Sequence, residues 1–524
     1  MRETGGGVAR AERAGDRLDP ERLAVLVAGS GPRVPIRSPF DNQLIGEVPT
    51  STAGDVTAAA AHARRAQLAW AATGIEQRAQ LLLDFHDQLL DRLEVFADLI
   101  QSEAGKSRLS AVEEVMHVAL TARYYGRTAR RYLHSERGEG LFPMLTRVDR
   151  HYVPQGIVAV IAPWNYPLTM AVSDALPALV AGNAVICKPD AQTPFIALAA
   201  VELLRAGGLP ADLFQIVNGP GPEVGPQLIA ESDYVCFTGS TATGKKVAAQ
   251  CAERLIGCSL ELGGKNPLLV LSDADVEVAA LGAVRACFAN AGQLCVATER
   301  IYVAEPLLPG FCDALVTQTE ALRLGSARDY ANDMGCLINP AQVERVTQHV
   351  EDARSKGAQV LTGGRLRTEL GALFYEPTVL TGVTAEMDCY AEETFGPVVS
   401  VYPVADDAQA IARANESPYG LNASVWTSDP ARGRRVAAQI TCGTVNVNEG
   451  FAATFGSIDA PMGGMKASGI GRRQGRDGIR RFVQVQSVAT QSGIPVAPSH
   501  GLSVQRYAAL MTIALRTLKK LGRA

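Results

Sequence analysis

Hydrophobic residues recur at helical spacing through the first quarter of the chain. Between about Ser51 and His134, the stretch "AQLLLDFHDQLLDRLEVFADLI" places apolar residues three and four positions apart, which lines one face of a helix. The preceding stretch, "STAGDVTAAAAHARRAQLAW", opens with helix-capping residues. "EAGKS" at 103–107 ends like a phosphate-binding P-loop, but Ile100 stands where the first glycine of that loop belongs. We therefore predict helices here, with a break at 103–107.

From residue 157 onward, short apolar runs alternate with helical segments. The runs are "IVAVIA" (157–162), "AVICK" (184–188), "FQIVN" (214–218), "YVCFTG" (234–239) and "SLELGG" (259–264). Such a rhythm predicts parallel strands joined by crossover helices, with ligand sites at the carboxyl ends of the strands. A second alternation runs from Pro267 to about Thr444 and predicts another domain of the same kind. The expected fold class is α/β.

Two further segments alternate strictly between polar and apolar residues, as half-exposed strands do. They are "RVDRHYV" (147–153) and "FVQVQSVAT" (482–490), and they could pair with each other or with another subunit.

Near the C-terminus, one helical face carries Tyr507, Leu510, Met511, Ala514, Leu518 and Leu521, with basic residues at the end of the helix. This pattern predicts an amphipathic helix that packs on the protein's own surface or on a neighbouring subunit, with a membrane surface as the alternative.

Length and composition fit a globular protein of two or three domains: 524 residues, 47% hydrophobic and 20% charged. The net charge of −4 gives no electrostatic reason to expect a nucleic-acid partner. Residues 1–20 carry charge and glycine but no apolar segment of a signal peptide, so we expect a mobile tail. The most apolar stretch, 157–187, is interrupted by prolines and polar residues and cannot span a membrane.

Ten cysteines are scattered along the chain without a C-x-x-C pair, and the seven histidines lie away from them. This favours reduced thiols in a cytoplasmic protein over a structural zinc site, and we expect no metal site.

A glycine loop, "FTGSTATGKK" (237–246), nearly matches the P-loop pattern. A P-loop needs Ser or Thr after its lysine as a Mg²⁺ ligand, and this chain has Lys246 there. The loop also differs from G-x-G-x-x-G. Still, a strand leads into Gly239 and Ser240, and a helix is expected from about Ala242. Small residues at a helix N-terminus suit a phosphate, although a plain strand–helix turn explains the loop by itself equally well.

Several motifs occur around this loop in a fixed order. They are "APWNYP" (162–167), "CKPDAQTP" (187–194), "LELGGKNP" (260–267), "NAGQLCVATERIYV" (290–303) and "EETFGPVV" (392–399). Together they resemble the aldehyde dehydrogenase superfamily from about Pro35 to Thr490, and within it the bacterial enzymes assigned as NADP-dependent succinate-semialdehyde dehydrogenases. The glycine loop would then serve the pyrophosphate region of NAD(P) rather than ATP.

The resemblance implies a domain organisation and an oligomer. A modified doubly wound NAD(P)-binding domain is expected at 21–134 and 154–263, and an α/β catalytic domain at 264–465. Strands within 135–153 and 480–495 would form a small oligomerisation sheet of a homodimer or homotetramer. Tails remain at 1–20 and 500–524.

The resemblance also implies three catalytic residues. Cys295 would be the nucleophile, because a thiolate adds to an aldehyde, lets its carbon expel hydride, and leaves a thioester that water can hydrolyse. Glu261, at the end of an apolar run where burial raises a carboxyl pKa, would be the general base. The side chain of Asn165 and the backbone N–H of Cys295 would stabilise the oxyanion. Outside this context, Asn165 is a turn residue, Glu261 a strand-end ion pair, and each cysteine, including Cys287, a buried thiol. No histidine lies in a matching motif, which argues against a Cys–His hydrolase.

The implied cofactor is NADP, with NAD as the alternative. Lys188 would reach a ribose hydroxyl or phosphate, Glu393 the nicotinamide ribose, and Phe395 would pack nearby. Ala191 stands where NAD-preferring relatives carry glutamate, so the repulsion against a 2′-phosphate is removed. The expected cofactor-binding residues are Trp164, Asn165, Lys188, Pro189, Asp190, Ala191, Gly239, Ser240, Leu262, Glu393 and Phe395.

Three positions depart from the family pattern. Arg473, in "SGIGRRQG", replaces a second glutamate that many members carry. Ser173 and Ala289 stand where arginines would bind the distal carboxylate of succinate semialdehyde. We therefore expect succinate semialdehyde to be turned over less efficiently than a less charged aldehyde, and an apolar or aromatic aldehyde is the alternative substrate. A catalytically silent structural member and a coenzyme-A-dependent acylating enzyme are rival hypotheses, against which Cys295, Glu261 and Asn165 speak.

Overall fold

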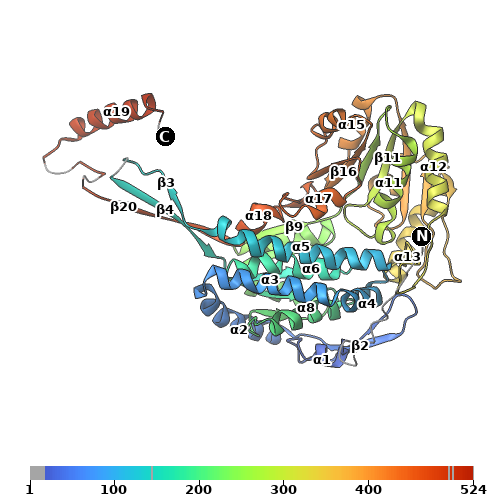
Figure 1. Cartoon of the computed structure of the whole chain (residues 1–524), viewed down its shortest axis with the longest axis horizontal. Helices are drawn as coiled ribbons and strands as arrows, with labels where there is room; N and C mark the ends of the chain where they lie inside the picture. Colours follow the sequence, from blue (N-terminus) through green and yellow to red (C-terminus); the bar gives the residue numbers. More distant parts are fainter. Residues whose placement is uncertain (1–17, 143–144, 494–495, 499–500, 523–524) are drawn as a thin grey trace, which may run out of the picture.

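The computed structural model describes residues 18–142, 145–493, 496–498 and 501–522. The tail predicted at 1–20 therefore lies outside the described residues, except for 18–20. Figure 1 shows two larger bodies side by side and an arm that projects from one of them.

Helices dominate the first part of the chain, as predicted. A short helix, α1 (Pro20–Ala24), and a hairpin of β1 (Arg33–Arg37) and β2 (Leu44–Pro49) precede α2 (Ala53–Ala72), α3 (Ile75–Asp91), α4 (Leu93–Ala104) and α5 (Arg108–Leu133). The start of α2 is a reciprocal cap, in which Thr52 Oγ1 accepts from Asp55 N and Asp55 Oδ2 accepts from Thr52 N. The predicted break at 103–107 is confirmed: α4 ends at Gly105, with φ of 67°, and Ser107 caps α5.

The five apolar runs between 157 and 264 form one sheet. Its strand order is β19-β9-β8-β5-β6-β7, parallel throughout except for the short edge strand β19. The strands are β5 (Ile157–Ile161), β6 (Ala184–Lys188), β7 (Phe214–Ile216), β8 (Tyr234–Thr238), β9 (Gly257–Glu261) and β19 (Gly469–Ile470). The connecting helices are α6 (Pro167–Val172), α7 (Ala175–Val180), α8 (Pro194–Ala206), α9 (Gly221–Glu231) and α10 (Thr241–Glu253).

The second predicted alternation forms a seven-stranded sheet of order β12-β13-β14-β11-β10-β16-β17, in which only β12 is antiparallel to its neighbour. The strands are β10 (Asn266–Val270), β11 (Thr298–Ala304), β12 (Gln359–Thr362), β13 (Thr378–Thr381), β14 (Val398–Val404), β16 (Asn422–Trp426) and β17 (Thr444–Val447). Its helices include α11 (Val276–Phe288), α12 (Leu308–Glu320), α13 (Pro340–Ser355), α14 (Asp388–Ala391), α15 (Asp407–Asn415) and α16 (Pro430–Ala437). Shorter elements, α17 (Ala452–Gly456) and α18 (Gly475–Arg480), lie between the two sheets (Figure 1).

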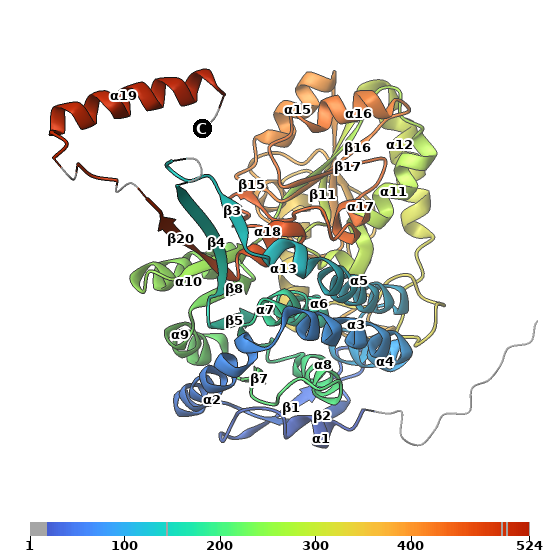
Figure 2. The same ribbon diagram turned by 60° about the vertical axis from the view of Figure 1, so that its left-hand side comes forward.

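The projecting arm is a third sheet, built from β3 (Glu136–Gly138), β4 (Thr146–Pro154) and β20 (Val483–Gln491). The two alternating segments pair with each other, from Val483 opposite Pro154 to Gln491 opposite Thr146. Helix α19 (Val504–Lys520) follows the arm and stands away from both larger sheets (Figure 2), and none of its residues is buried. The predicted helix is therefore present, but packing on the protein's own surface is not found.

Within the described part of the chain, no helix is both long enough and apolar enough to cross a membrane.

A fully buried ion pair ties α5 to the segment that carries Asn165. Lys106 Nζ lies 2.7 Å from Glu114 Oε2, and both side chains have no exposed surface. The ammonium also sits 3.4 Å from the centre of the Tyr166 ring. Glu114 Oε1 accepts from Thr169 N at 2.9 Å, at the first turn of α6. Each charge in this cluster depends on its partner, because neither reaches water.

We expect Lys106→Ala to lower the free energy of unfolding by about 3–5 kcal/mol, because it leaves Glu114 buried without its counter-charge. Denaturant unfolding followed by circular dichroism would measure the loss. The control is Arg413→Ala, which removes a half-exposed pair with Glu416 at 3.2 Å and should cost about 1 kcal/mol or less. Equal losses in the two variants would contradict the role given to burial.

Candidate active site

A cavity of about 570 Å³ lies where the two larger sheets meet. It brings together nine of the residues expected from the sequence: Trp164, Asn165, Gly239, Ser240, Glu261, Leu262, Cys295, Glu393 and Phe395. These residues come from the carboxyl ends of β5, β8 and β9 and from the loops before β11 and β14. Parallel strands deliver their ends to the same edge of a sheet, which explains why residues far apart in sequence meet here.

Cys295 lies in a tightly held loop before β11. Asn266 Nδ2 donates to Cys295 O at 2.7 Å and to Ala297 O at 2.8 Å. A methyl group at Gly264 would come within 2.8 Å of Cys295 O, so glycine is needed beside this loop. Burial raises the pKa of the Cys295 thiol to about 12, with the charges of Glu261 and Glu393 adding to the rise. The sulfur is therefore a thiol that needs a base before it can act as a nucleophile.

Glu261 is the last residue of β9, and its carboxylate is the candidate base for the thiol proton of Cys295. Its side chain is buried, and Oε1 has no hydrogen-bond partner among the described residues. Burial raises the pKa of the Glu261 carboxyl to about 7, while the positive charge of Arg473 opposes the rise. A carboxyl with this pKa is poised to accept and release protons near neutral pH.

Asn165 is held against the loop of Cys295. Its Nδ2 donates to Gln293 O at 3.0 Å, and Asn290 Nδ2 donates to Asn165 O at 3.2 Å. Asn290 and Ala291 adopt φ near 53° and 54°, so the chain turns sharply before Cys295. A side-chain amide carries two N–H donors, which leaves one of them for an oxygen in the cavity.

Glu393 lines the part of the cavity where Gly263 and Phe395 also lie. Its Oε1 accepts from Gly264 N at 2.8 Å, and burial raises the pKa of the Glu393 carboxyl to about 8. A methyl group at Gly263 would come within 2.4 Å of Glu393 Oε2. Nearby, the ring of Phe395 meets Trp164 edge-on at 5.5 Å, with Phe395 at φ of 55°. Glycine at 263 and the turn at Phe395 thus shape this part.

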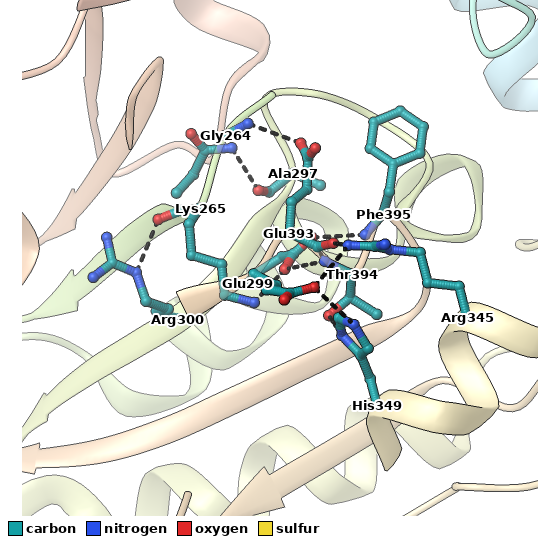
Figure 3. A network of polar contacts seen from close by, with 12 residues as sticks. Gly264, Lys265, Ala297, Glu299, Arg300, Arg345, His349, Glu393, Thr394 and Phe395 are labelled. Atoms are coloured by element: carbon teal, nitrogen blue, oxygen red, sulfur yellow. Dashed lines mark hydrogen bonds and ion pairs between the residues drawn. The ribbon is translucent and has the colours of Figure 1, made fainter. Parts of the chain in front are cut away.

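A buried network that sequence reasoning missed supports Glu393 (Figure 3). Glu299 pairs with Lys265 and accepts from Thr394 N and Phe395 N, each at 2.9 Å. From α13, Arg345 Nε donates to Glu393 O at 3.1 Å. The available signal was the charged residues inside two largely uncharged motifs, Lys265 in "LELGGKNP" and Glu299 in "CVATERIYV".

The glycine loop leads into the first turn of α10 at the wall of the cavity. Ser240 Oγ accepts from Thr243 N at 3.3 Å and caps the helix. A methyl group at Gly244 would come within 2.4 Å of Leu262, so this glycine lets α10 pack against the end of β9. The helix N-terminus therefore presents unpaired N–H groups and a favourable dipole to the cavity, which suits a phosphate.

Lys188, Pro189, Asp190 and Ala191 lie outside the cavity lining, at the carboxyl end of β6. Lys188 is buried, Nζ donates to Pro189 O at 2.7 Å, and no salt bridge to it is found among the described residues. Burial lowers the pKa of the Lys188 ammonium. Asp190 Oδ1 accepts from Gln192 N at 3.0 Å, within its own turn. A buried cation without a carboxylate partner fits an anionic or hydroxyl-rich group such as a nucleotide ribose phosphate.

Ser173 and Ala289, the two positions where arginines were expected, also lie outside the cavity lining. Ser173 is buried, with Oγ 3.4 Å from His117 Nδ1. Arg473, in contrast, lines the cavity together with Cys295 and Glu261.

Fold and cavity together define an oxidoreductase of the aldehyde dehydrogenase type, with a cysteine and a glutamate that line one cavity. The chain belongs to the aldehyde dehydrogenase family, whose model matches residues 26–488. It is 49% identical over 487 residues to a protein of Mycolicibacterium smegmatis named "putative succinate-semialdehyde dehydrogenase (NADP⁺)", covering 93% of this chain and 94% of that one.

Solved structures agree with this assignment. An Escherichia coli NADP-dependent enzyme superposes with a TM-score of 0.86 at 32% identity, covering 91% of this chain and all of the other. Betaine aldehyde dehydrogenase from Staphylococcus aureus in complex with NAD⁺ superposes with a TM-score of 0.85 at 32% identity, covering 89% and 92% of the two chains.

Proposed function

We propose that the protein oxidises an aldehyde to a carboxylic acid with NAD(P), and that succinate semialdehyde with NADP is its nominal reaction. The observation that carries this proposal is the meeting of Cys295, Glu261 and Asn165 in one cavity beside the N-terminus of α10. The name of the Mycolicibacterium relative supports the substrate and the nucleotide.

The first step is addition of sulfur to the aldehyde. Glu261 accepts the thiol proton, and the Cys295 thiolate forms a bond to the carbonyl carbon. The carbonyl oxygen becomes an oxyanion, to which the free N–H of Asn165 and the backbone N–H of Cys295 donate. A bound nicotinamide supplies the acceptor for the hydride that leaves this carbon, and Cys295 then carries a thioester.

The second half of the reaction releases the acid. Glu261 first releases the thiol proton to solvent; it then accepts a proton from water as the water oxygen adds to the thioester carbon, and the sulfur departs as a thiolate. A pKa of about 7 lets Glu261 accept this proton and pass it to solvent at neutral pH.

The residues present fit a dinucleotide. The first turn of α10, with Gly239 and Ser240, would bind the pyrophosphate. Glu393, fixed by Gly264 N, would accept from the nicotinamide ribose. Lys188 would reach the adenosine ribose or its 2′-phosphate, with Trp164, Pro189 and Leu262 beside the dinucleotide.

Ala191→Glu is expected to shift the preference from NADP⁺ towards NAD⁺ by about tenfold or more, because a carboxylate repels the 2′-phosphate and accepts from ribose hydroxyls. Asp190 should not interfere, since Gln192 already occupies its carboxylate. The measurement is kcat/KM for both nucleotides in both proteins. Ala191→Gln is the matched control, which adds volume without charge. An unchanged ratio in Ala191→Glu would show that this position does not set the choice.

A second candidate substrate class is an apolar or aromatic aldehyde. It is favoured by the apolar side chains that line the cavity near Cys295: Tyr166, Met170, Leu294, Phe455 and Met462. A kinetic screen of purified protein with succinate semialdehyde, butanal and benzaldehyde, each with both nucleotides, tests the proposal. Absence of aldehyde-dependent NAD(P)H formation with every substrate would instead favour a catalytically silent protein.

We also propose a homodimer or homotetramer assembled through the arm. Strand β20 is the edge of its sheet, and most of its side chains are exposed, including Val485 and Val488. An exposed apolar edge strand is a natural site for strand pairing between subunits. Helix α19 would cover a neighbouring subunit or lie on a membrane surface.

All ten cysteines are free thiols, which fits the expected reducing cytoplasm.

A further inference from the structure

One buried carboxylate is shared by two arginines beside the cavity. Asp174 Oδ2 lies 2.9 Å from Arg473 Nη2, and Asp174 Oδ1 lies 2.5 Å from Arg481 Nη2. All three side chains are less than 10% exposed. Burial alone would raise the pKa of Asp174, but the two guanidinium groups keep it below its ordinary value. When Glu261, whose charge also acts on Arg473, is protonated, Asp174 is the carboxylate that the two guanidinium groups share, and the cluster carries one negative and two positive charges.

The two arginines differ in the hydrogen bonds that their N–H groups make. Arg481 donates to Ser259 Oγ at 2.8 Å and to Gly478 O at 3.2 Å, in addition to Asp174. Arg473 donates from Nε to Asp174 Oδ1 at 3.3 Å and from Nη1 to the thioether of Met170 at 3.0 Å. A thioether is a weak acceptor, and Nη2 makes no well-oriented hydrogen bond among the described residues. Unused donors and the surplus charge thus both fall on Arg473.

Only Arg473 of this pair lines the cavity. The other cation of the lining, Arg345, donates to the backbone of Glu393. His117, near Arg473, adds no charge, because burial and the charge of Arg473 lower its pKa to about 3. Arg473 is therefore the cation that lines the cavity beside Met170, to whose sulfur it donates, and Phe455 and Met462 line the same cavity.

We propose that Arg473 binds the distal carboxylate of the substrate and selects short aldehydes that end in a carboxylate. This rests on the proposed function and assigns the cation that is missing at Ser173 and Ala289. Arg473 lines the same cavity as Cys295 and Glu261, and its charge acts on both groups. Two methylene groups separate aldehyde and carboxylate in succinate semialdehyde, so a nearby cation is what this substrate requires. This proposal replaces the sequence-based expectation that succinate semialdehyde is turned over less efficiently than a less charged aldehyde.

Arg473→Gln tests the proposal through the ratio of two kcat/KM values, one for succinate semialdehyde and one for butanal. Butanal carries a methyl group where succinate semialdehyde carries its carboxylate. We expect kcat/KM for succinate semialdehyde to fall by about 30-fold more than kcat/KM for butanal, because a buried charge pair is lost only for the former. Arg473→Lys should recover part of this difference as a lower KM. Arg481→Gln leaves Asp174 to neutralise Arg473 alone, so it should also lower kcat/KM for succinate semialdehyde relative to butanal, by less than Arg473→Gln.

Equal losses for both aldehydes in Arg473→Gln would overturn the proposal and make Arg473 a positioning residue for Glu261. A wild type that oxidises neither aldehyde would contradict the proposed function instead, so the two failures are distinguishable.

A second measurement needs no variant. Succinate should protect wild-type Cys295 from alkylation by iodoacetamide at concentrations where butyrate does not. Equal protection by the two acids would also overturn the proposal.

Discussion

Cys295→Ala should lower kcat for aldehyde oxidation by about 10⁴-fold or more, because removing a covalent nucleophile removes the whole reaction path. Nucleotide binding should persist, since the α10 N-terminus, Lys188 and Glu393 do not depend on the sulfur. Aldehyde-dependent NAD(P)H formation and nucleotide titration of the same preparation would measure both quantities.

The matched control is Cys287→Ala. Cys287 is a buried thiol on α11 that does not line the cavity, and burial raises its pKa as it does for Cys295. This variant should keep the wild-type order of magnitude in kcat. Substantial turnover by Cys295→Ala would refute the nucleophile, whereas loss in both variants would indicate damage to the fold.

Glu261→Gln is expected to lower steady-state kcat by about 10²- to 10⁴-fold through loss of the base for thioester hydrolysis. The carboxylate is the active form, and its pKa is raised to about 7, so wild-type kcat should increase as the pH rises through about 7. The glutamine variant should lack this rise. A rapid-mixing experiment would compare the first turnover of NAD(P)H with the steady state.

Glu393→Gln is the control for a second buried carboxyl in the same cavity. It should raise KM for the nucleotide while keeping the rise of kcat through about pH 7, because Glu261 is intact. If the kcat–pH profile of Glu261→Gln is the same as that of the wild type, another residue is the base.

Much of the fold was predictable because its signals are local. The break at 103–107 requires only a glycine with positive φ and a serine cap, both visible in "EAGKS". Strands β4 and β20 follow from strict alternation of polar and apolar residues, although most side chains of β20 are exposed in the structure. Their partner was left open, because alternation says which face is buried but not which chain covers it; the structure pairs them with each other.

The candidate site was predictable only in part. Ordered motifs singled out Cys295, Glu261 and Asn165, since each motif preserves a local backbone shape around one reacting group. The surplus charge at Arg473 was not predictable, because it depends on Asp174 and Arg481 from segments that meet only in the folded chain. In the sequence, Arg473 indicated only a missing glutamate.

The sequence by itself thus determined the periodic elements and the α/β class, and it supplied the proposal for the reacting groups; all of these depend on neighbouring residues and short motifs. The tertiary structure alone decided the electrostatics: that Lys106 is neutralised by Glu114, that Lys265 pairs with Glu299, and that Arg473 shares the one carboxylate of Asp174 with Arg481. The physical reason is that burial multiplies the strength of charge interactions, and burial is a property of the packed chain.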